Sequence, residues 1–510
     1  MEFASVLFIE LFLPVVLVVY YLLGFIKNGK VQMTARNSFL LLASVLFYAF
    51  GGIRELFIFL AVILVNFFAG FTMGKIGPDK KGARRAVYLT ALLTDILTLI
   101  VFKYTATVVN FVDMIRKGDG VKNALEGLLR FDGSGFFSLA VPLAISFFIF
   151  QAVSYLSDVY FNKIKPTKNF LTFSLYMTLL CQLTQGPIMR FGNLGGQIEN
   201  RSHSLDMFVY GMKRFVYGLA KKVLIANVAA EQVNIIFASS AEQVKDTPTL
   251  FVNVTEMGAP IAWLGLILFT IQIYYDFSGY TDMAIGVGSM LGFKIDENFN
   301  YPYTSLSVQE FWRRWHISLS NWFKDYVYIP LGGSRCSKAR ACLNVGIVFL
   351  LTGVWHASAG LFTFVIWGLI FVVASIVERL FLGKLLKKNP VKPINWIYTM
   401  LVVMIGWVFF RADNLDYAGK FIGQLFCFHG SAGARPHYVL DYLSVKVVLA
   451  LVFGIILSGF LQRLLTKPRE KIGGKLPFRI IELVFVIAVF AICMVEVVGG
   501  SFASSIYLKF

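Results

Sequence analysis

Long runs of hydrophobic residues alternate with short polar segments along the whole chain. An α-helix rises about 1.5 Å per residue, so about 20 apolar residues cross the ~30 Å hydrocarbon core of a bilayer. The pattern therefore predicts an all-α polytopic membrane protein, and because no linker rich in Pro, Gly or Ser interrupts it, a single membrane domain over residues 1–510. The runs that predict spans lie near residues 4–26, 38–52, 55–74, 86–109, 136–160, 260–292, 342–359, 361–382, 394–411, 441–462 and 480–499.

The region between residues 170 and 258 departs from this pattern. Its first apolar segment, 170–188, ends in a helix-breaking glycine and proline, which predicts a re-entrant or broken helix. Segment 207–222 is amphipathic and basic, which predicts an interfacial helix on the cytoplasmic side, followed by a crossing near 223–240. Irregular backbone at membrane depth is tolerated only where it is buried in protein or lines a cavity, so a cavity is expected here.

Residues 294–341 are too polar for an ordinary span, yet they are dense in aromatic side chains. Each central Asp, Lys or Arg would cost about 2.5–3.5 kcal/mol in hydrocarbon. We therefore expect a short helix over about 307–325, with loops on both sides, that enters from the cytoplasmic face and returns to it. In that arrangement His316 points inward, towards a cavity.

Composition narrows the class of protein. Hydrophobic residues make up 57% of the chain and charged residues 15%, whereas soluble domains are about 25% charged. Soluble, disordered and fibrous classes are thereby excluded. The net charge of +18 is typical of cytoplasmic loops that lie beside anionic lipid, and no nucleic-acid partner is expected. The five cysteines form no CxxC pair and have no histidine at zinc-ligand spacing, so no metal site is expected.

Basic loops alternate with loops that are poor in charge or balanced. Because cytoplasmic loops carry the excess of Lys and Arg, the alternation predicts that the basic loops face the cytoplasm. Both termini would then lie outside, in a multi-pass protein of the cytoplasmic (inner) membrane. The basic loops are 27–36, 75–85, 162–168, 383–393 and 463–479.

His316 and His356 are the histidines in unusual surroundings. On one helix Trp312, His316 and Ser320 would share a face, because they are spaced by four residues. Such a histidine either takes part in the function of the protein or has a structural role, anchored among aromatic side chains at the membrane interface. His356 lies inside the apolar run 342–359, where an ionisable group is a functional-site hypothesis by default. A desolvated, neutral histidine suits general-base work, although a structural hydrogen bond is the alternative.

Two carboxylates, Asp276 and Asp282, also lie inside an expected span, 260–292. Charged groups at that depth need partners. Arg313 or Arg314 is expected to supply them. Structural ion pairs are favoured over a direct catalytic role.

The block Tyr275–Arg335, YDFSGYTDMAIGVGSMLGFKIDENFNYPYTSLSVQEFWRRWHISLSNWFKDYVYIPLGGSR, resembles the signature of the membrane-bound O-acyltransferase (MBOAT) family, and within it the bacterial alginate O-acetyltransferase branch. The resemblance covers nearly the whole chain, with a signature core at about 136–382 and additional C-terminal helices at about 394–499. Ala357 is a small departure, because many relatives carry glycine there. Further similarity lies in PLAISFFIFQAVSYLSDVY (Pro142–Tyr160), QLTQGPIMRF (Gln182–Phe191), GVWHA (Gly353–Ala357) and LFLPVVLVVYY (Leu11–Tyr21).

This resemblance implies a ring of about 11 to 13 tilted transmembrane helices, with re-entrant and interfacial helices, around a central funnel or tunnel. It implies acyl transfer from a cytoplasmic thioester donor, expected to be acetyl-CoA, to a hydroxyl, with no permanently bound cofactor. The second family histidine matches His356, the expected base, and the first matches His316, expected to position the donor carbonyl or stabilise charge. Arg313 and Arg314 are expected to hold donor phosphates. The residues expected to shape the tunnel are Asp276, Asp282, Trp312, Trp315 and Ser320.

The function expected from the resemblance is O-acetylation of an exported or cell-surface polysaccharide, completed by an extracytoplasmic partner protein. One alternative within the family is a D-alanyl transfer protein for teichoic acid. Those proteins tend to be shorter, and the apolar runs after residue 390 favour acetyl transfer. A transporter or flippase without covalent chemistry is the alternative from another class, and repeats or paired broken helices, which would favour it, are not visible.

Overall fold

The computed structural model describes residues 1–77, 79–114, 142–244, 247, 250–357, 361–428, 437–461 and 476–500. Within these ranges the regular secondary structure is helical, as the apolar runs predict. Most of the expected loop 463–479, and the first residues of the expected span 136–160, lie outside them.

Eight helices in the described part of the chain are long and apolar enough to cross a membrane. Together with the shorter apolar helices Ile145–Tyr160 and Val445–Phe460, they confirm a polytopic all-α membrane protein. The expected span 38–52 forms the second half of α2 (Gly29–Ala49). The eight candidate spans are Leu7–Phe25, Glu55–Ile76, Lys81–Thr105, Gly258–Met290, Lys338–His356, Phe362–Lys388, Lys392–Arg411 and Leu476–Val498.

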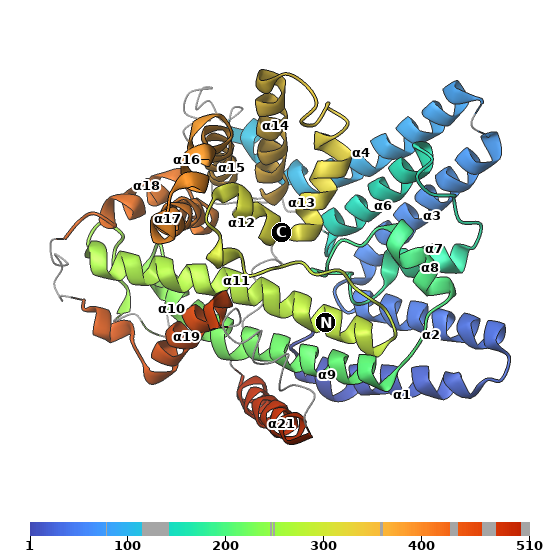
Figure 1. Ribbon diagram of the computed structural model, residues 1–510, viewed down its shortest axis with the longest axis horizontal. Coiled ribbons are helices and arrows are strands. Elements are labelled where there is room, and N and C mark those ends of the chain that lie inside the picture. Colours follow the sequence, from blue (N-terminus) through green and yellow to red (C-terminus); the bar gives the residue numbers. More distant parts are fainter. Residues whose placement is uncertain are drawn as a thin grey trace.

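The long helix α11 (Gly258–Met290) runs across the middle of the molecule, with one group of helices above its left half and another around its right end in Figure 1. The N-terminal group comprises α1 (Leu13–Leu22), α2, α3 (Ile53–Ile76), α4 (Lys81–Met114), α6 (Ile145–Tyr160), α7 (Phe170–Thr178) and α8 (Phe191–Glu199). The C-terminal group comprises α14 (Lys338–His356), α15 (Leu361–Val377), α16 (Gly383–Lys388), α17 (Lys392–Arg411) and α18 (Leu415–Gln424). The short helices α12 (Val308–Arg314) and α13 (Ile317–Phe323) lie between the two groups. Two further helices, α19 (Val445–Ile455) and α21 (Leu476–Val498), complete the C-terminal region.

A second long helix accompanies α11 (Figure 1). α9 (Leu205–Ala220) continues through a π-helical turn, η4 (Lys221–Asn227), into α10 (Val228–Ile236), and its backbone stays helical at both junctions. The two helices approach closely at glycines: a Cβ added to Gly211 would lie 2.6 Å from the carbonyl oxygen of Gly286. Small residues of this kind let helix backbones pack tightly in membranes.

The expected division of this region into two separate helices, over 207–222 and near 223–240, is therefore wrong, because the helix is continuous from Leu205 to Ile236. The basic side chains that suggested an interfacial helix pair with carboxylates of neighbouring helices. Lys213 lies 2.5 Å from Glu482 of α21, and Arg214 lies 2.7 Å from Asp282 of α11. The basic positions of this helix thus serve, at least at Lys213 and Arg214, to pair with other helices.

Buried side chains form two hydrophobic clusters that meet along α11. The N-terminal cluster contains the second half of α11, from Tyr280 onward, and the helices up to α8. The C-terminal cluster contains the first half of α11, up to Phe277, together with α10, α15, α17 and α18. The boundary between the clusters also crosses the segment from α12 to α13, because Trp315 belongs to the C-terminal cluster and Leu319 to the N-terminal one.

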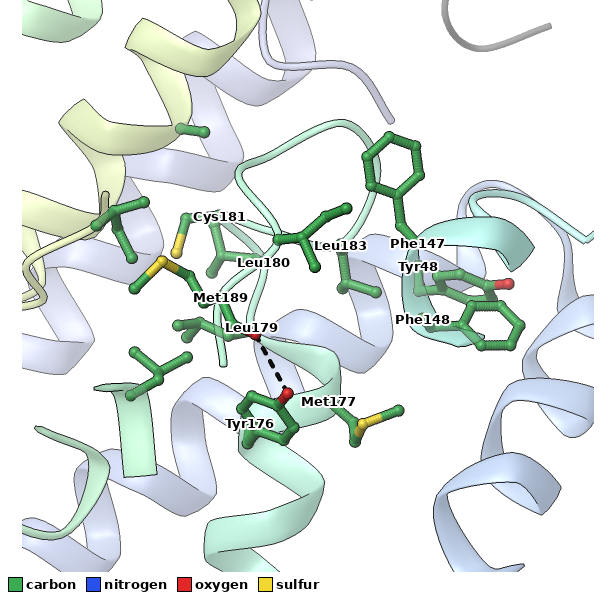
Figure 2. Packing of buried hydrophobic residues seen from close by; sticks show 14 of the residues in the cluster. Tyr48, Phe147, Phe148, Tyr176, Met177, Leu179, Leu180, Cys181, Leu183 and Met189 are labelled. Carbon is green, nitrogen blue, oxygen red and sulfur yellow. Dashed lines mark hydrogen bonds between the residues drawn. The ribbon is translucent and has the colours of Figure 1, made fainter. Parts of the chain in front are cut away.

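The segment that follows α7 is irregular and wholly buried, which confirms the broken helix expected over 170–188. α7 ends at Thr178, and residues 179–189 continue without regular structure inside the N-terminal cluster. Figure 2 shows Leu183 of this segment beside the rings of Tyr48 of α2 and of Phe147 and Phe148 of α6, with Leu179, Leu180, Cys181 and Met189 farther from those rings. The phenol of Tyr176 donates to the carbonyl of Met189 at 3.2 Å and so ties the end of the segment to α7.

Candidate active site

A sharp break separates α12 from α13, and His316 lies in it. His316 has a φ of 45°, in the left-handed region that non-glycine residues rarely adopt. The single helix expected over 307–325 is therefore wrong, and Trp312, His316 and Ser320 do not share one helical face. Instead the hydroxyl of Ser320 donates to the carbonyl of Trp312 at 3.2 Å, across the break.

Asn298, which is fully buried, holds the break in place. Its backbone carbonyl accepts from the amide of Ile317 at 2.9 Å. Its side-chain Oδ1 accepts from the amide of Ser318 at 3.1 Å and from the hydroxyl of Ser318 at 2.9 Å. These bonds satisfy the first amides of α13, which have no partner within the helix, and so the strained conformation of His316 is fixed.

The same Oδ1 of Asn298 lies 3.2 Å from Nδ1 of His316. Because an amide oxygen only accepts hydrogen bonds, Nδ1 carries the proton, and the neutral ring keeps a lone pair at Nε2. Nε2 is buried and has no hydrogen-bond partner among the residues that the structure describes. Burial lowers the pKa of His316 to about 3, so the ring stays neutral at physiological pH. His316 therefore presents a hydrogen-bond acceptor in a desolvated setting.

His356 is the last residue of α14 and is 4% exposed. Aromatic rings from three helices surround its imidazole. The ring centroids lie 4.4 Å away for Trp355 of α14, 5.2 Å for Trp367 of α15 and 5.2 Å for Phe410 of α17. Desolvation of this kind favours the neutral imidazole over the charged form.

One indole ring connects the two histidines. The ring centroid of Trp355 lies 6.5 Å from that of His316 and 4.4 Å from that of His356. Both histidines also lie where the hydrophobic clusters meet, because Trp355 belongs to the N-terminal cluster and Ala357 to the C-terminal one. The fold thus brings together the two histidines that the sequence singled out.

The buried carboxylates of α11 form ion pairs with a different helix from the one expected. Asp276 lies 2.5 Å from Lys222 of η4, and both side chains are almost fully buried. Asp282 pairs with Arg214 at 2.7 Å and with Lys221 at 2.6 Å. These partners follow from the close packing of α9 and η4 on α11. The expectation that Arg313 or Arg314 supplies the positive charge was wrong, whereas the structural ion pairs that the sequence favoured are present.

The two arginines of α12 have different surroundings. Arg314 pairs with Glu310 of the same helix at 2.6 Å. Arg313 lines a cavity of about 520 Å³ between α12 and the segment from η9 (Glu378–Leu382) to α17. The carboxylate of Glu378 accepts from the amide of Val308 at 2.6 Å and thereby fixes the start of α12 beside the cavity. The charged residues that line the cavity are Arg313, Arg379, Lys384, Lys387, Lys392, Glu310 and Glu378.

Comparison with known proteins gives the family of this chain. The family model for MBOAT, the membrane-bound O-acyltransferase family, matches residues 80–412. The chain belongs to the MBOAT family. The matched region contains α12, α13 and α14, and with them both histidines.

Several curated members of the MBOAT family are similar over most of the chain. The probable alginate O-acetylase AlgI of Pseudomonas putida is 38% identical over 430 residues, which cover 84% of this chain and 81% of that protein. The peptidoglycan O-acetyltransferase of Helicobacter pylori is 32% identical over 452 residues, covering 82% and 78%. The teichoic acid D-alanyltransferase of Bacillus subtilis is 28% identical over 291 residues, covering 54% and 69%. The protein is thus a membrane acyltransferase, as the sequence motifs indicated.

Two residues beside His356 were missed in the sequence. Lys103 and Tyr104 of α4 both donate to carbonyls in the last turn of α14, to Trp355 and Val354 respectively. A signal was available for Lys103, because a lysine inside the apolar run 86–109 is as unusual as a histidine inside 342–359. Among the described residues, no group of three or more His, Cys, Asp or Glu side chains is placed to hold a metal ion.

Proposed function

We propose that this protein transfers an acetyl group from a cytoplasmic thioester, acetyl-CoA, for O-acetylation of an exported or cell-surface polysaccharide. The observation that carries the proposal is the convergence of His316 and His356 on the ring of Trp355, inside a desolvated aromatic pocket. The names of the relatives support the chemistry, because the similar proteins of Pseudomonas putida and Helicobacter pylori are named a probable alginate O-acetylase and a peptidoglycan O-acetyltransferase.

His356 acts as the general base. Its neutral imidazole takes the proton of the attacking hydroxyl while the hydroxyl oxygen bonds to the thioester carbonyl carbon. The carbon–sulfur bond then breaks, and the leaving thiolate takes up the proton held by His356 to become a thiol, which returns His356 to its neutral form. General-base assistance of this kind contributes about 10²–10⁴-fold to the rate.

His316 is the second polar group of the reaction. Because its Nδ1–H is directed to Asn298, the neutral ring can only accept a hydrogen bond at Nε2. It can thus orient a donor N–H or a hydroxyl near the reacting carbonyl. It stabilises developing negative charge only after taking up a proton.

The donor reaches the site from the cytoplasmic side, with its phosphates in the basic cavity beside α12. Arg313 lines that cavity together with Arg379 and lysines of α16 and α17, and guanidinium groups suit bidentate phosphate binding. Arg314, held by Glu310, is less directly placed for this role. The two histidines lie at different depths on one tunnel, and the N-terminus lies outside the cytoplasmic membrane. An extracytoplasmic partner protein completes the transfer to the polysaccharide.

D-alanyl transfer to teichoic acid is the competing function within the family. The similar D-alanyltransferase of Bacillus subtilis covers 54% of this chain, against 84% for the alginate O-acetylase of Pseudomonas putida. The greater coverage favours acetyl transfer. A transporter without covalent chemistry is not favoured, because the chain is a member of an acyltransferase family.

The direct test is the acetyl-ester content of surface polysaccharide in cells with and without this protein. We expect esters to disappear when the gene is removed and to return when it is supplied again. Unchanged ester content in the deletion strain would contradict the proposal. D-alanyl esters that disappear in place of acetyl esters would establish the competing function.

A further inference from the structure

The last turn of α14 ends at His356, and its carbonyl groups need partners from outside the helix. The final four carbonyls of any α-helix lack an intrahelical partner. Here the carbonyl of Val354 accepts from the amide of Ala357 at 3.0 Å and from the phenol of Tyr104 at 2.7 Å. The carbonyl of Trp355 accepts from the ammonium of Lys103. Two consecutive residues of α4 therefore bond to two consecutive carbonyls next to His356.

Lys103 is bound firmly in this place. Its side chain is 2% exposed, and its ammonium also lies 3.4 Å from the hydroxyl of Ser146 of α6. The same ammonium lies 5.4 Å from the ring centroid of Trp355, within the range of a cation–π contact. The carbonyl oxygens at a helix C-terminus carry partial negative charge, which suits the N–H donors of a lysine side chain.

We propose that Lys103 and Tyr104 form a clamp that positions His356 for proton transfer. This inference rests on the proposed role of His356 as the base. Both residues act through the backbone of α14, so they are positioning residues and not catalytic ones. The clamp fixes the carbonyls of the two residues before His356, and with them the direction of its Cα–Cβ bond. Small misplacements of a catalytic group, of about 1 Å, cost up to 10²-fold in rate.

The chain offers a matched control for Tyr104. Tyr21 of α1 donates its phenol to the carbonyl of Met290, the last residue of α11, also at 2.7 Å. Tyr104→Phe and Tyr21→Phe therefore each remove one hydroxyl and one hydrogen bond to a helix C-terminus. Only the first of these bonds lies beside His356.

The experiment complements a deletion strain with the full-length chain and measures the initial rate of acetyl-ester accumulation on surface polysaccharide, divided by the amount of folded protein in the membrane. We expect Tyr104→Phe to lower this rate about tenfold, in line with a small displacement of the base, and Tyr21→Phe to leave it within about twofold. Lys103→Met should lower the rate further. Lys103→Arg should recover part of the loss, because it keeps side-chain N–H donors for the carbonyl of Trp355. A residue that only supported folding would change the amount of folded protein and leave the rate per folded molecule unchanged.

Equal rates for Tyr104→Phe and Tyr21→Phe, or equal rates for Lys103→Arg and Lys103→Met, would overturn the clamp. His356→Ala, measured in parallel, separates this failure from a failure of the proposed function. If His356→Ala loses its rate while the two Tyr variants agree, only the clamp is wrong. If His356→Ala keeps the wild-type rate, the assignment of the base is wrong and the clamp falls with it.

Discussion

Two regions of this protein bury ionisable side chains, and they do so in opposite ways. Along α9, η4 and α11 the buried groups are charged and paired, as in Asp276 with Lys222 at 2.5 Å. Where α13 and α14 meet, the buried groups are imidazoles enclosed by aromatic rings, as in His356 against Trp355, Trp367 and Phe410. In the first region the paired charges hold two helices together. The second keeps groups that can change protonation in a setting where the neutral form is favoured.

The difference shows that a buried ionisable side chain in a membrane protein can either stabilise the structure or take part in chemistry. A charge that has a close partner is fixed, since removing a proton or a partner leaves an uncompensated buried charge. A neutral imidazole can take up a proton during a reaction and release it again. Mutations in the two regions should therefore separate effects on stability from effects on turnover.

The largest effect is expected at His356. His356→Ala should lower the rate of acyl transfer per folded molecule by about 10²–10⁴-fold, because it removes the general base. Thermal unfolding in detergent should change little, since a small apolar residue is tolerated at the end of α14. Ester levels equal to those of the wild type would remove His356 from the mechanism.

The ion-paired region should respond through stability. Asp276→Leu leaves Lys222 buried without its ion-pair partner and should lower the free energy of unfolding by about 3–5 kcal/mol. The double variant Asp276→Leu/Lys222→Met should recover most of this loss, because two apolar side chains replace both charges. Unfolding in detergent measures the free energy of unfolding of the single and the double variant. The exposed pair Lys420–Asp416 is the control, and Lys420→Met should cost under about 0.5 kcal/mol.

His316→Ala should lose most of its activity and keep a residual rate, because His316 orients a reactant and does not itself remove the hydroxyl proton. Turnover per folded molecule is the measurement. A variant that has lost thermostability in detergent while keeping its turnover would show that His316 serves packing alone, through its bond to Asn298.

The smallest effect concerns pH. The pKa of His316 is lowered to about 3 in the folded protein, against about 6.5 in an unfolded chain. Between these values the unfolded state binds a proton that the native state does not, so stability falls as the pH falls. From pH 7.5 to pH 5.5, His316 should cost the wild type about 1.4 kcal/mol. His316→Asn lacks this contribution, and an identical pH dependence in the two proteins would contradict the buried neutral imidazole.

Much of this architecture could be predicted from the sequence. The apolar runs located the spans, because the length of a hydrophobic run can be read from consecutive residues without knowledge of their contacts. The motif around Trp315 and the motif around His356 pointed to the family, because each of them is a run of consecutive residues.

Contacts between distant segments were harder to predict. The break at His316 depends on Asn298, which lies eighteen positions earlier, and the helical spacing of the local sequence concealed it. The partners of Asp276 and Asp282 depend on the packing of η4 against α11, and nearby arginines in the sequence were misleading. The lysine at position 103 could be recognised in the sequence as unusual within an apolar run. Its hydrogen bond to the carbonyl of Trp355 could not be predicted from the sequence.

The most direct single measurement compares turnover per folded molecule in His356→Ala and in Asp276→Leu/Lys222→Met, in membranes of the same complemented strain. We expect the first variant to fall by at least about 10²-fold with normal levels of folded protein. We expect the second to keep at least about half of the wild-type rate once the amount of folded protein is taken into account, because the pair it replaces holds helices together. The reverse result, an active His356→Ala and a folded but inactive double variant, would contradict the assignment of chemistry to the aromatic pocket and of structure to the ion pairs.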